Sequence, residues 1–406
     1  MTSTLTQEKH GLDELFRDFV SKQQEPEWLS DIRKQAFAQL QKTHFPNSQM
    51  EAWRKFPLQN LNIQSLLQNL SQEAQQPARF DSIAACTISS FQEVAEKDRS
   101  FVTSSLQGLV ESYKDDFFSL LTLAFSTQGV FCDVEKGAQV DLLNIQTQIT
   151  ATAGLPIFLL RVQAFAKVFL SESYGQEEPE SFGLVAPLAA IYQEESSQLH
   201  YNLVDNFSAS TFHIRRVHSQ QKRDSSLELS YFYLKGYRGK AFFDNLLNEP
   251  GSRFKGIGVA TAIKREYQDL EMTVSHLASH TESEIIYKSV VKDKSHHVFT
   301  GNLIVPQTSK HVAASQLNNN LMLSKTARAE SIPKLEVFAE DVQCIHGATV
   351  GEIEEEQLFY ILSRGIKESD ARLLLLEAFL SSIIDLIPQQ EIADGLKGQL
   401  IEKLGV

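Results

Sequence analysis

The chain has 406 residues, enough for two or three units with their own cores, and its 42% hydrophobic and 22% charged residues are ordinary for a globular protein. Its 51 acidic residues outnumber its 38 basic ones, which gives a formal net charge of −13. Sequence-independent nucleic-acid binding and docking on anionic membranes both need dense Lys and Arg, so the composition speaks against both classes.

The first ten residues carry no apolar core after a basic segment, so we expect no secretory signal. No stretch approaches the roughly 20 apolar residues that a membrane-spanning helix needs. The three cysteines, Cys86, Cys132 and Cys344, are too few and too far apart for a disulfide framework. A cytoplasmic protein is therefore the simplest expectation.

Residues 11–43 are predicted to be helical, because apolar residues recur there at steps of three and four. Pro26 divides this segment into two helices, since proline suits the first turn of a helix. Residues 60–125 are mixed and rich in Gln, and the apolar run at 115–125 within them predicts a partly buried helix.

From about residue 128 short β-rich runs follow one another, and several alternate apolar with polar residues as half-buried strands do. Such a series is compatible with a sandwich, a barrel or a solenoid. Tight hairpins favour Asn-Gly and Asp-Gly, but the chain has no Asn-Gly, and its only Asp-Gly lies outside this region. Wider turns, as in a β-helix, are therefore favoured. The predicted strands are 129–134, 157–162, 199–204, 212–215, 227–234, 270–274, 285–291 and 335–338.

Three successive asparagines, Asn318, Asn319 and Asn320, also fit a β-helix. Stacked coils can align such side chains in hydrogen-bonded ladders. A polar turn is the plainer explanation of the same residues, because Asn is common in turns.

After Gly351 the pattern becomes helical again. One helix follows Glu354 and ends near Gly365, and a second runs from Ser369 to about Leu386. The second helix is apolar on more than one face, so it is either a core helix or is covered by a partner. The candidate docking residues are Leu373, Leu374, Leu376 and Phe379.

Cys344 and His346 form the most informative pair of residues. If residues 341–346 are extended, the thiol and the imidazole point to the same face, because side chains in a strand alternate with period two. Two groups that can bind metal or act as nucleophiles would then lie side by side. A small buried cysteine and a satisfied core histidine are the alternative.

Several motifs in a fixed order resemble the SufB/SufD family of the SUF iron–sulfur cluster assembly system. Glu51-Ala52-Trp53-Arg54 is similar to its Glu-x-Trp-Arg motif, although Lys55-Phe56 follows where Tyr-Thr is usual. The resemblance covers roughly residues 125–385. The further matching segments are 276–281 (HLASHT), 287–288 (YK), 299–301 (FTG), 316–324 (QLNNNLMLS), 333–337 (PKLEV), 341–351 (DVQCIHGATVG) and 358–365 (LFYILSRG).

The resemblance implies a mainly β fold, a right-handed parallel β-helix flanked by helical domains. We expect an N-terminal mostly helical domain at 1–125, a β-helix core at 126–345 and a C-terminal helical domain at 346–406. The short length and the lack of further cysteines resemble SufD more than SufB. A non-catalytic scaffold subunit is implied, with the paralogue SufB paired through the β-helix and the ATPase SufC through the C-terminal helices.

The resemblance also assigns the site. The histidine that matches His346 lies at the SufB–SufD interface and takes part in cluster building, with the cysteine that matches Cys344 beside it. Thiolate and imidazole are soft ligands that suit a transient iron–sulfur cluster, but two ligands do not complete a four-coordinate site. The remainder would come from SufB, sulfide or water.

Other motifs are weaker. His276 and His280, with His296, His297 and His311 nearby, could chelate metal, but surface or ladder histidines are the favoured interpretation. Gly256-Ile257-Gly258 imitates part of a dinucleotide fingerprint, and glycines in a tight β-turn explain it better. The sequence has no phosphate-binding G-x-x-x-x-G-K-[ST] motif, so we expect no ATP site in this chain.

Two rival functions stay open at this point. A β-helical enzyme that acts on polysaccharide has the same predicted architecture. A homodimeric metal-binding module that acts alone would use the same β-helix surface, because a surface built for a paralogue can also meet its own copy.

Overall fold

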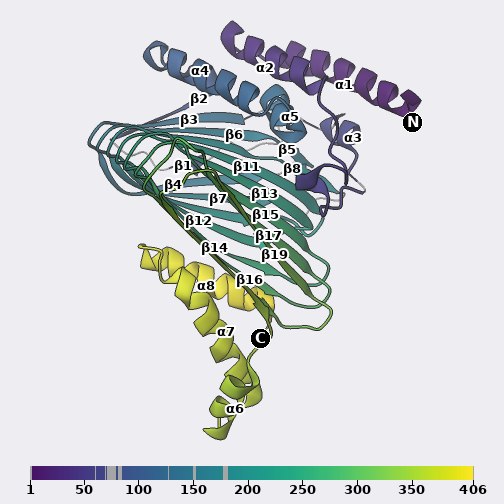
Figure 1. The fold of residues 1–406 in the computed structure, drawn as a ribbon. Coiled ribbons are helices and arrows are strands. Elements are labelled where there is room, and N and C mark those ends of the chain that lie inside the picture. Colours follow the sequence, from purple (N-terminus) through teal and green to yellow (C-terminus); the bar gives the residue numbers. More distant parts are fainter. Residues whose placement is uncertain are drawn as a thin grey trace.

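The computed structural model describes residues 2–59, 61–68, 70, 79–80, 85–126, 128–149, 152–176 and 182–405. Helices gather at both ends of the molecule, and strands fill the middle (Figure 1). None of the helices in these ranges is both long and apolar enough to cross a membrane. The helices are α1 (Thr2–Lys22), α2 (Glu27–Leu40), α3 (Ile63–Gln68), α4 (Glu96–Ser112), α5 (Phe117–Phe125), α6 (Glu355–Ser363), α7 (Glu368–Ile384) and α8 (Gln390–Leu404), with 3-10 turns η1 (Glu51–Trp53) and η2 (Phe91–Glu93).

The strands form a parallel β-solenoid of about seven turns, in which the chain alternates between two facing sheets. One sheet has the order β1 (Arg79–Phe80), β4 (Gln139–Ile149), β7 (Lys167–Gln176), β10 (Gln198–Asn206), β12 (Ser226–Lys235), β14 (Arg253–Ala262), β16 (Glu282–Val291), β18 (Val312–Met322), β20 (Val342–Gly351). The other has the order β19 (Arg328–Val337), β17 (His296–Val305), β15 (Tyr267–His276), β13 (Arg238–Leu247), β11 (Thr211–Gln221), β9 (Leu188–Gln193), β6 (Pro156–Val162), β3 (Gln128–Val134), β2 (Cys86–Ser90), with β5 (Ala153–Gly154) and β8 (Gly183–Val185) beside it. The mainly β class with helical ends is confirmed.

Most turns between the sheets have four or more residues, as the absence of Asn-Gly predicts, although only two residues join β12 to β13. Many place one residue in the left-handed conformation, and along one edge of the solenoid these residues stack coil upon coil. Phe165 N donates to Glu195 O, and Ser196 N donates to Arg223 O, so backbone hydrogen bonds join each turn to the next coil. Because its backbone groups are hydrogen-bonded to the neighbouring turn, such a turn does not depend on an Asn-Gly or Asp-Gly sequence.

Apolar residues form three main cores. The first lies between the two sheets, inside the solenoid. The second joins α2, α4 and α5 to the outer face of the β6–β9–β11–β13 sheet; all nine residues of α5 are buried, and its seven apolar residues belong to this core. The third joins α7 and α8 to the outer face of the other sheet, through residues such as Phe232 and Leu380. The helical ends therefore cover the two outer faces of the solenoid (Figure 1).

The predicted break at Pro26 is confirmed, since α2 begins at Glu27. The turn predicted for Gly256-Ile257-Gly258 is wrong, because both glycines lie inside strand β14. A Cβ atom at Gly258 would overlap the Tyr231 carbonyl oxygen and the Tyr287 ring. These glycines make room for inward-facing aromatic side chains, and no phosphate-binding turn exists there.

The asparagine segment lies in β18, not in a turn. Asn320 Nδ2 donates to Thr349 O at 3.1 Å, and Ser289 Oγ donates to Asn320 Oδ1 at 2.6 Å. Side-chain hydrogen bonds therefore do run from coil to coil. Their partners on neighbouring coils are serine and threonine hydroxyls and backbone groups, so the structure has mixed polar ladders and not stacked asparagines.

Candidate functional site

The last coil of the solenoid is open to its surroundings. Strands β19 and β20 end their sheets, and in the described part of the chain each pairs with one neighbouring strand. Their side chains are unusually accessible: Ile345 is 68% exposed and Leu335 is 38% exposed. An edge strand presents unpaired N–H and C=O groups that can pair with another chain. This end of the solenoid is therefore the part of the molecule best prepared for a strand-to-strand contact.

Cys344 and His346 both lie in the middle of β20, and the extended conformation predicted for them is confirmed. Cys344 pairs in register with Ala314, and His346 pairs with Gln316. Cys344 packs against the core inside the solenoid, so the period of two turns His346 to the same side. His346 is exposed because β20 is the terminal strand of its sheet in the described part of the chain. Partial burial raises the pKa of the Cys344 thiol.

The last strand runs to Gly351, past the predicted domain boundary at residue 345. The pair is therefore held by a rigid strand and does not lie at a strand–helix junction. Because β18 fixes the register on one side, the spacing of the two side chains is set by the sheet and not by a loop.

Gln316 is a residue of this site that motif reading did not single out. It is only 4% exposed, yet neither its Oε1 nor its Nε2 has a hydrogen-bond partner within the described structure. A Cβ atom at Gly301 would overlap the Gln316 amide, so this glycine leaves the space that the amide occupies. A buried amide without a partner is costly, and here it lies one strand below His346. Only the strand register could have brought the two together.

The remaining histidines do not form a metal centre in the described residues, where no group of three or more possible ligands is found. His276 is fully buried, and its two ring nitrogens lie 2.8 Å from Thr281 Oγ1 and from Ser283 Oγ. His280 and His311 occupy neighbouring turns and stack with their ring centroids 4.7 Å apart. The favoured interpretation was surface or ladder histidines; the stacked His280 and His311 agree with it, whereas His276 is a buried core residue and not a surface one.

The N-terminal motif reaches the same end of the solenoid. Trp53 packs on Phe242, and the Glu51 carboxylate accepts a hydrogen bond from Lys334 Nζ at 2.6 Å. Lys55 pairs with Glu330, which also lies on β19. The segment that follows Trp53 at the family's Tyr-Thr position is thus an anchor between the N-terminal domain and the last coil.

The predicted docking helix α7 has two different sides. Leu376 is fully buried between the helix and the sheet, so it does not face a partner in this fold. Phe379 packs partly against the same core, and Leu373 is half-buried. Leu374 is 46% exposed. Helix α6, which packs on α7, has no buried residue at all, and its Phe359 is 72% exposed.

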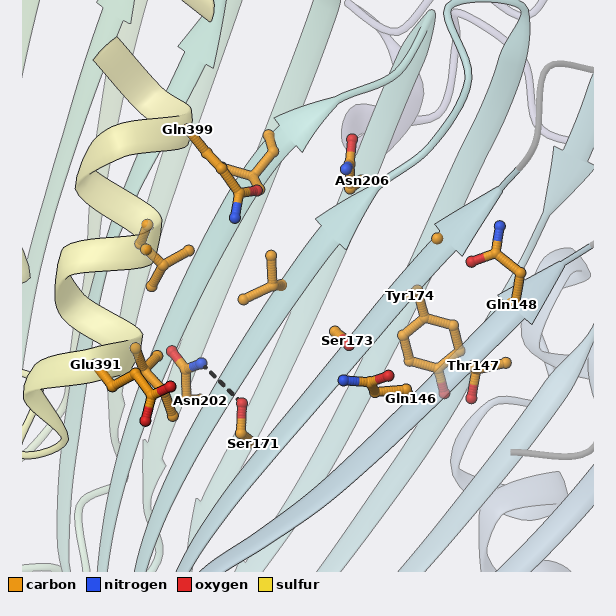
Figure 2. A pocket seen from close by; sticks show the side chains of 16 residues that line it. Gln146, Thr147, Gln148, Ser171, Ser173, Tyr174, Asn202, Asn206, Glu391 and Gln399 are labelled. Carbon is orange, nitrogen blue, oxygen red and sulfur yellow. Dashed lines mark hydrogen bonds between the residues drawn. The ribbon is translucent and has the colours of Figure 1, made fainter. Parts of the chain in front are cut away.

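A groove of about 650 Å³ lies between α8 and the outer face of β4, β7 and β10. Figure 2 shows amides and hydroxyls projecting into it from the strands, with Glu391 and Gln399 from α8 on its far side. Asn202 Nδ2 donates to Ser171 Oγ at 3.2 Å. Glycosidic cleavage uses two facing carboxyl groups, and Glu391 is the one carboxylate among the described lining residues. This groove therefore does not provide the acid–base pair of a polysaccharide-cleaving enzyme.

Comparisons with known proteins agree with the family motifs found in the sequence. The family profile described as "SUF system FeS cluster assembly, SufBD core domain" matches residues 147–379. The chain is 35% identical over 159 residues to the "Iron-sulfur cluster assembly protein SufD" of Escherichia coli, covering 39% of this chain and 37% of the relative. It is 25% identical over 425 aligned positions to the protein of the same name from Bacillus subtilis, covering 96% of each.

An "Iron-sulfur cluster assembly SufBD family protein" from Synechocystis is 30% identical over 243 residues, which cover 57% of this chain and 53% of the relative. The matched region thus spans about half, or less, of the Synechocystis and Escherichia coli proteins, and nearly all of the Bacillus subtilis protein. In this chain the profile match includes β20 and ends within α7, so it contains both Cys344 and His346.

Proposed function

This chain belongs to the SufBD family of the SUF iron–sulfur cluster assembly system, and from that premise we propose that it is a non-catalytic scaffold subunit. In this proposal it pairs with SufB through the last coil of the solenoid, holds the ATPase SufC on its C-terminal helices, and contributes ligands to a nascent cluster. One observation carries the proposal: a thiol and an imidazole share one face of an uncovered terminal strand.

The donor set suits iron and sulfide as cargo. Cys344 offers a soft thiolate once it is deprotonated, and His346 offers an imidazole nitrogen that is accessible from outside. Iron–sulfur clusters need more ligands than these two, and the described residues add no third one nearby. A second subunit seated on the open end would complete the set. Gln316, with both amide atoms free, would then hydrogen-bond to bound sulfide or to the His346 ring.

The pairing with SufB is supported by the edges of β19 and β20. A strand from a related solenoid can extend each sheet by backbone hydrogen bonding and give register without matched side chains. Exposed Ile345 and Leu335 would be covered by such a contact. The paralogue is the proposed occupant because its own solenoid would end in an edge of the same kind.

The pairing with SufC is supported by the exposed apolar side chains of α6 and α7. Phe359 and Tyr360 are 72% and 60% exposed, and Leu374 on α7, the helix that α6 packs against, is 46% exposed. Large aromatic side chains of this kind are frequent anchors in protein interfaces. The chain has no phosphate-binding loop of its own, so ATP hydrolysis in the proposed partner would drive any conformational change. Three unpaired thiols fit a reducing compartment, and we propose the cytoplasm.

The test is anaerobic co-purification with SufB and SufC, with mass determination by light scattering, followed by cluster reconstitution from iron and sulfide. We expect a stable complex of the three proteins. His346→Ala should leave the complex and its melting temperature unchanged while lowering the cluster yield about tenfold, because one of the few ligands of the cluster is lost; a tenfold change in binding corresponds to about 1.4 kcal/mol. Phe359→Ser should weaken the binding of SufC alone.

His200→Ala is the matched control, because His200 lies partly exposed on the outer face of β10, away from the last coil. It should change neither the complex nor the cluster yield. Full cluster assembly by the His346→Ala complex would remove that residue from the site. A homodimer that binds iron and ignores both partners would instead favour the stand-alone metal-binding module.

A further inference from the structure

The two cysteines that the proposed function does not use lie next to each other at the opposite end of the solenoid. Cys86 is the first residue of β2, and Cys132 lies on the antiparallel neighbour β3. The register places Cys86 opposite Val134, and Ile88 opposite Cys132, so the cysteines are diagonal neighbours on one face. Their thiols are hydrogen-bonded to each other. Forty-five residues separate them in the sequence, and only the strand pairing brings them together.

The two thiols have different surroundings. Cys132 is fully buried in the core inside the solenoid, whereas Cys86 packs against that core and is partly exposed. The hydrogen bond from Cys132 lowers the pKa of Cys86, despite partial burial and the nearby Glu135 and Asp133 carboxylates. The same hydrogen bond, together with burial, raises the pKa of Cys132. Thiolate reactivity therefore resides on the accessible cysteine, and the buried one is positioned behind it.

From this geometry we propose that Cys86 and Cys132 form a peroxide-sensitive dithiol, in which Cys86 is the attacking cysteine and Cys132 the resolving cysteine. This inference does not depend on the proposed function, because Cys344 and His346 lie at the other end of the solenoid.

The chemistry balances with hydrogen peroxide as the oxidant. The Cys86 thiolate attacks one peroxide oxygen, the O–O bond breaks, and the departing hydroxide takes up a proton to give water and a Cys86 sulfenic acid. The Cys132 thiol then loses its proton and its sulfur attacks the Cys86 sulfur, which breaks the S–O bond and releases a second water. One peroxide is reduced, and two thiols are oxidised to one disulfide.

The position of the pair gives the disulfide a structural consequence. The closed loop would contain α4 and α5, the two helices that lie between Cys86 and Cys132 in the chain. Strand β2 ends its sheet, so it can shift toward β3 without breaking a second ladder. A cross-link here would tie the edge strand and both helices to the first coil and restrict their opening.

The experiment uses the full-length, fully reduced chain, treated anaerobically with a small excess of hydrogen peroxide after removal of the reductant. We expect an intramolecular disulfide in each chain, seen as the loss of two hydrogen atoms by intact mass and as a Cys86–Cys132 linked peptide after digestion. Dithiothreitol should reverse it, and the melting temperature of the oxidised chain should be higher. Cys344→Ser should react in the same way as the wild type.

Two variants separate the roles of the cysteines. Cys132→Ser should accumulate a dimedone-reactive sulfenic acid on Cys86, and Cys86→Ser should lose the rapid reaction. The proposal would be overturned by wild-type protein that gives only sulfinic or sulfonic acid at Cys86, only intermolecular cross-links, or oxidation at Cys344 alone. Because the wild-type peptide map decides the matter by itself, a variant that folds poorly does not prevent the test.

Discussion

The middle of the solenoid and its open end both contain polar side chains that face inward. The two regions differ in the hydrogen-bond partners that these side chains have. In the middle, Arg215 makes two hydrogen bonds to Asp205, of 2.8 and 2.6 Å, and Tyr231 Oη donates to the same carboxylate at 2.9 Å. Burial alone would raise the pKa of Asp205, but Arg215 and these hydrogen bonds outweigh it and the pKa is lowered. Near the open end, the Gln316 amide and both nitrogens of His297 have no partner in the described structure.

This difference separates buried polar groups that stabilise the fold from buried polar groups that are available to a ligand or partner. In the middle, the charges of the buried Asp205–Arg215 pair compensate each other within the chain, although Arg215 Nη1 and both ring nitrogens of His213 have no hydrogen-bond partner in the described structure. A buried amide without a partner, below an exposed imidazole and a half-buried thiol, is completed only when something else arrives. We therefore expect substitutions in the middle to change stability, and substitutions at the open end to change function.

The largest expected effect is that of Arg215→Ala. The substitution leaves the Asp205 carboxylate buried without its cation, and breaking a buried pair in this way typically costs about 3–5 kcal/mol. Urea denaturation of the isolated chain should show a correspondingly lower free energy of unfolding. Arg253→Ala is the control, because its pair with Glu282 is about two-thirds exposed on both sides and should cost less than about 1 kcal/mol. Equal losses in the two variants would contradict the comparison.

Much of the fold could be predicted from the sequence because its signals are local. The break at Pro26 and the strand composition of residues 129–134 and 157–162 are properties of short segments. The absence of Asn-Gly correctly indicated that the turns are not tight two-residue hairpins, and backbone hydrogen bonds join them to the next coil. Strands such as β13 and β14 were not predicted, because their apolar and polar residues do not alternate clearly when the outer face is also covered.

The candidate site was predictable only in part. Cys344 and His346 are two residues apart, so an extended segment was enough to place them on one face. The position of Gln316 below His346, and of Cys86 beside Cys132, depends on register between strands far apart in sequence. No pattern within a window of the chain contains that register. The same reason explains why Gly258 resembled a turn residue, although it makes room for Tyr287 from a neighbouring coil.

The next largest expected effect is a loss of stability at low pH, caused by the buried His297 near the open end. Burial lowers the pKa of His297 to about 3, with a smaller contribution from His296. The folded chain therefore keeps this imidazole neutral while the unfolded chain protonates it below about pH 6.5, so stability falls as the pH drops from about 6.5 toward 3. At pH 5 this one group should cost about 2 kcal/mol relative to pH 8.

His297→Phe removes that cost, because the ring nitrogens have no partners to lose and the ring packs against Tyr287. The variant should melt at a higher temperature than the wild type at pH 5, with a smaller difference at pH 8. His276→Phe should differ, since it removes the ring nitrogens that bond the hydroxyls of Thr281 and Ser283, of which Thr281 keeps its bond to Ala278 O, and so destabilises the chain at both pH values. An unchanged acid response of His297→Phe would mean that this histidine is hydrated in the folded chain.

The smallest expected effect on stability is that of Gln316→Met, and it decides whether the open end is built for cargo. Replacing an unpartnered buried amide by an apolar side chain of similar length should leave the free energy of unfolding unchanged or raise it by about 1 kcal/mol. Gln193→Met, the control in the middle of the solenoid, loses a hydrogen bond of 2.9 Å to Ser226 O and should lower stability by about 1 kcal/mol. If the amide serves the cluster, Gln316→Met will lower the cluster yield in the reconstituted complex even though the chain is no less stable. A stable variant with a full yield would leave the free amide without a function, and the contrast between the two regions would then rest on His346 and Cys344 alone.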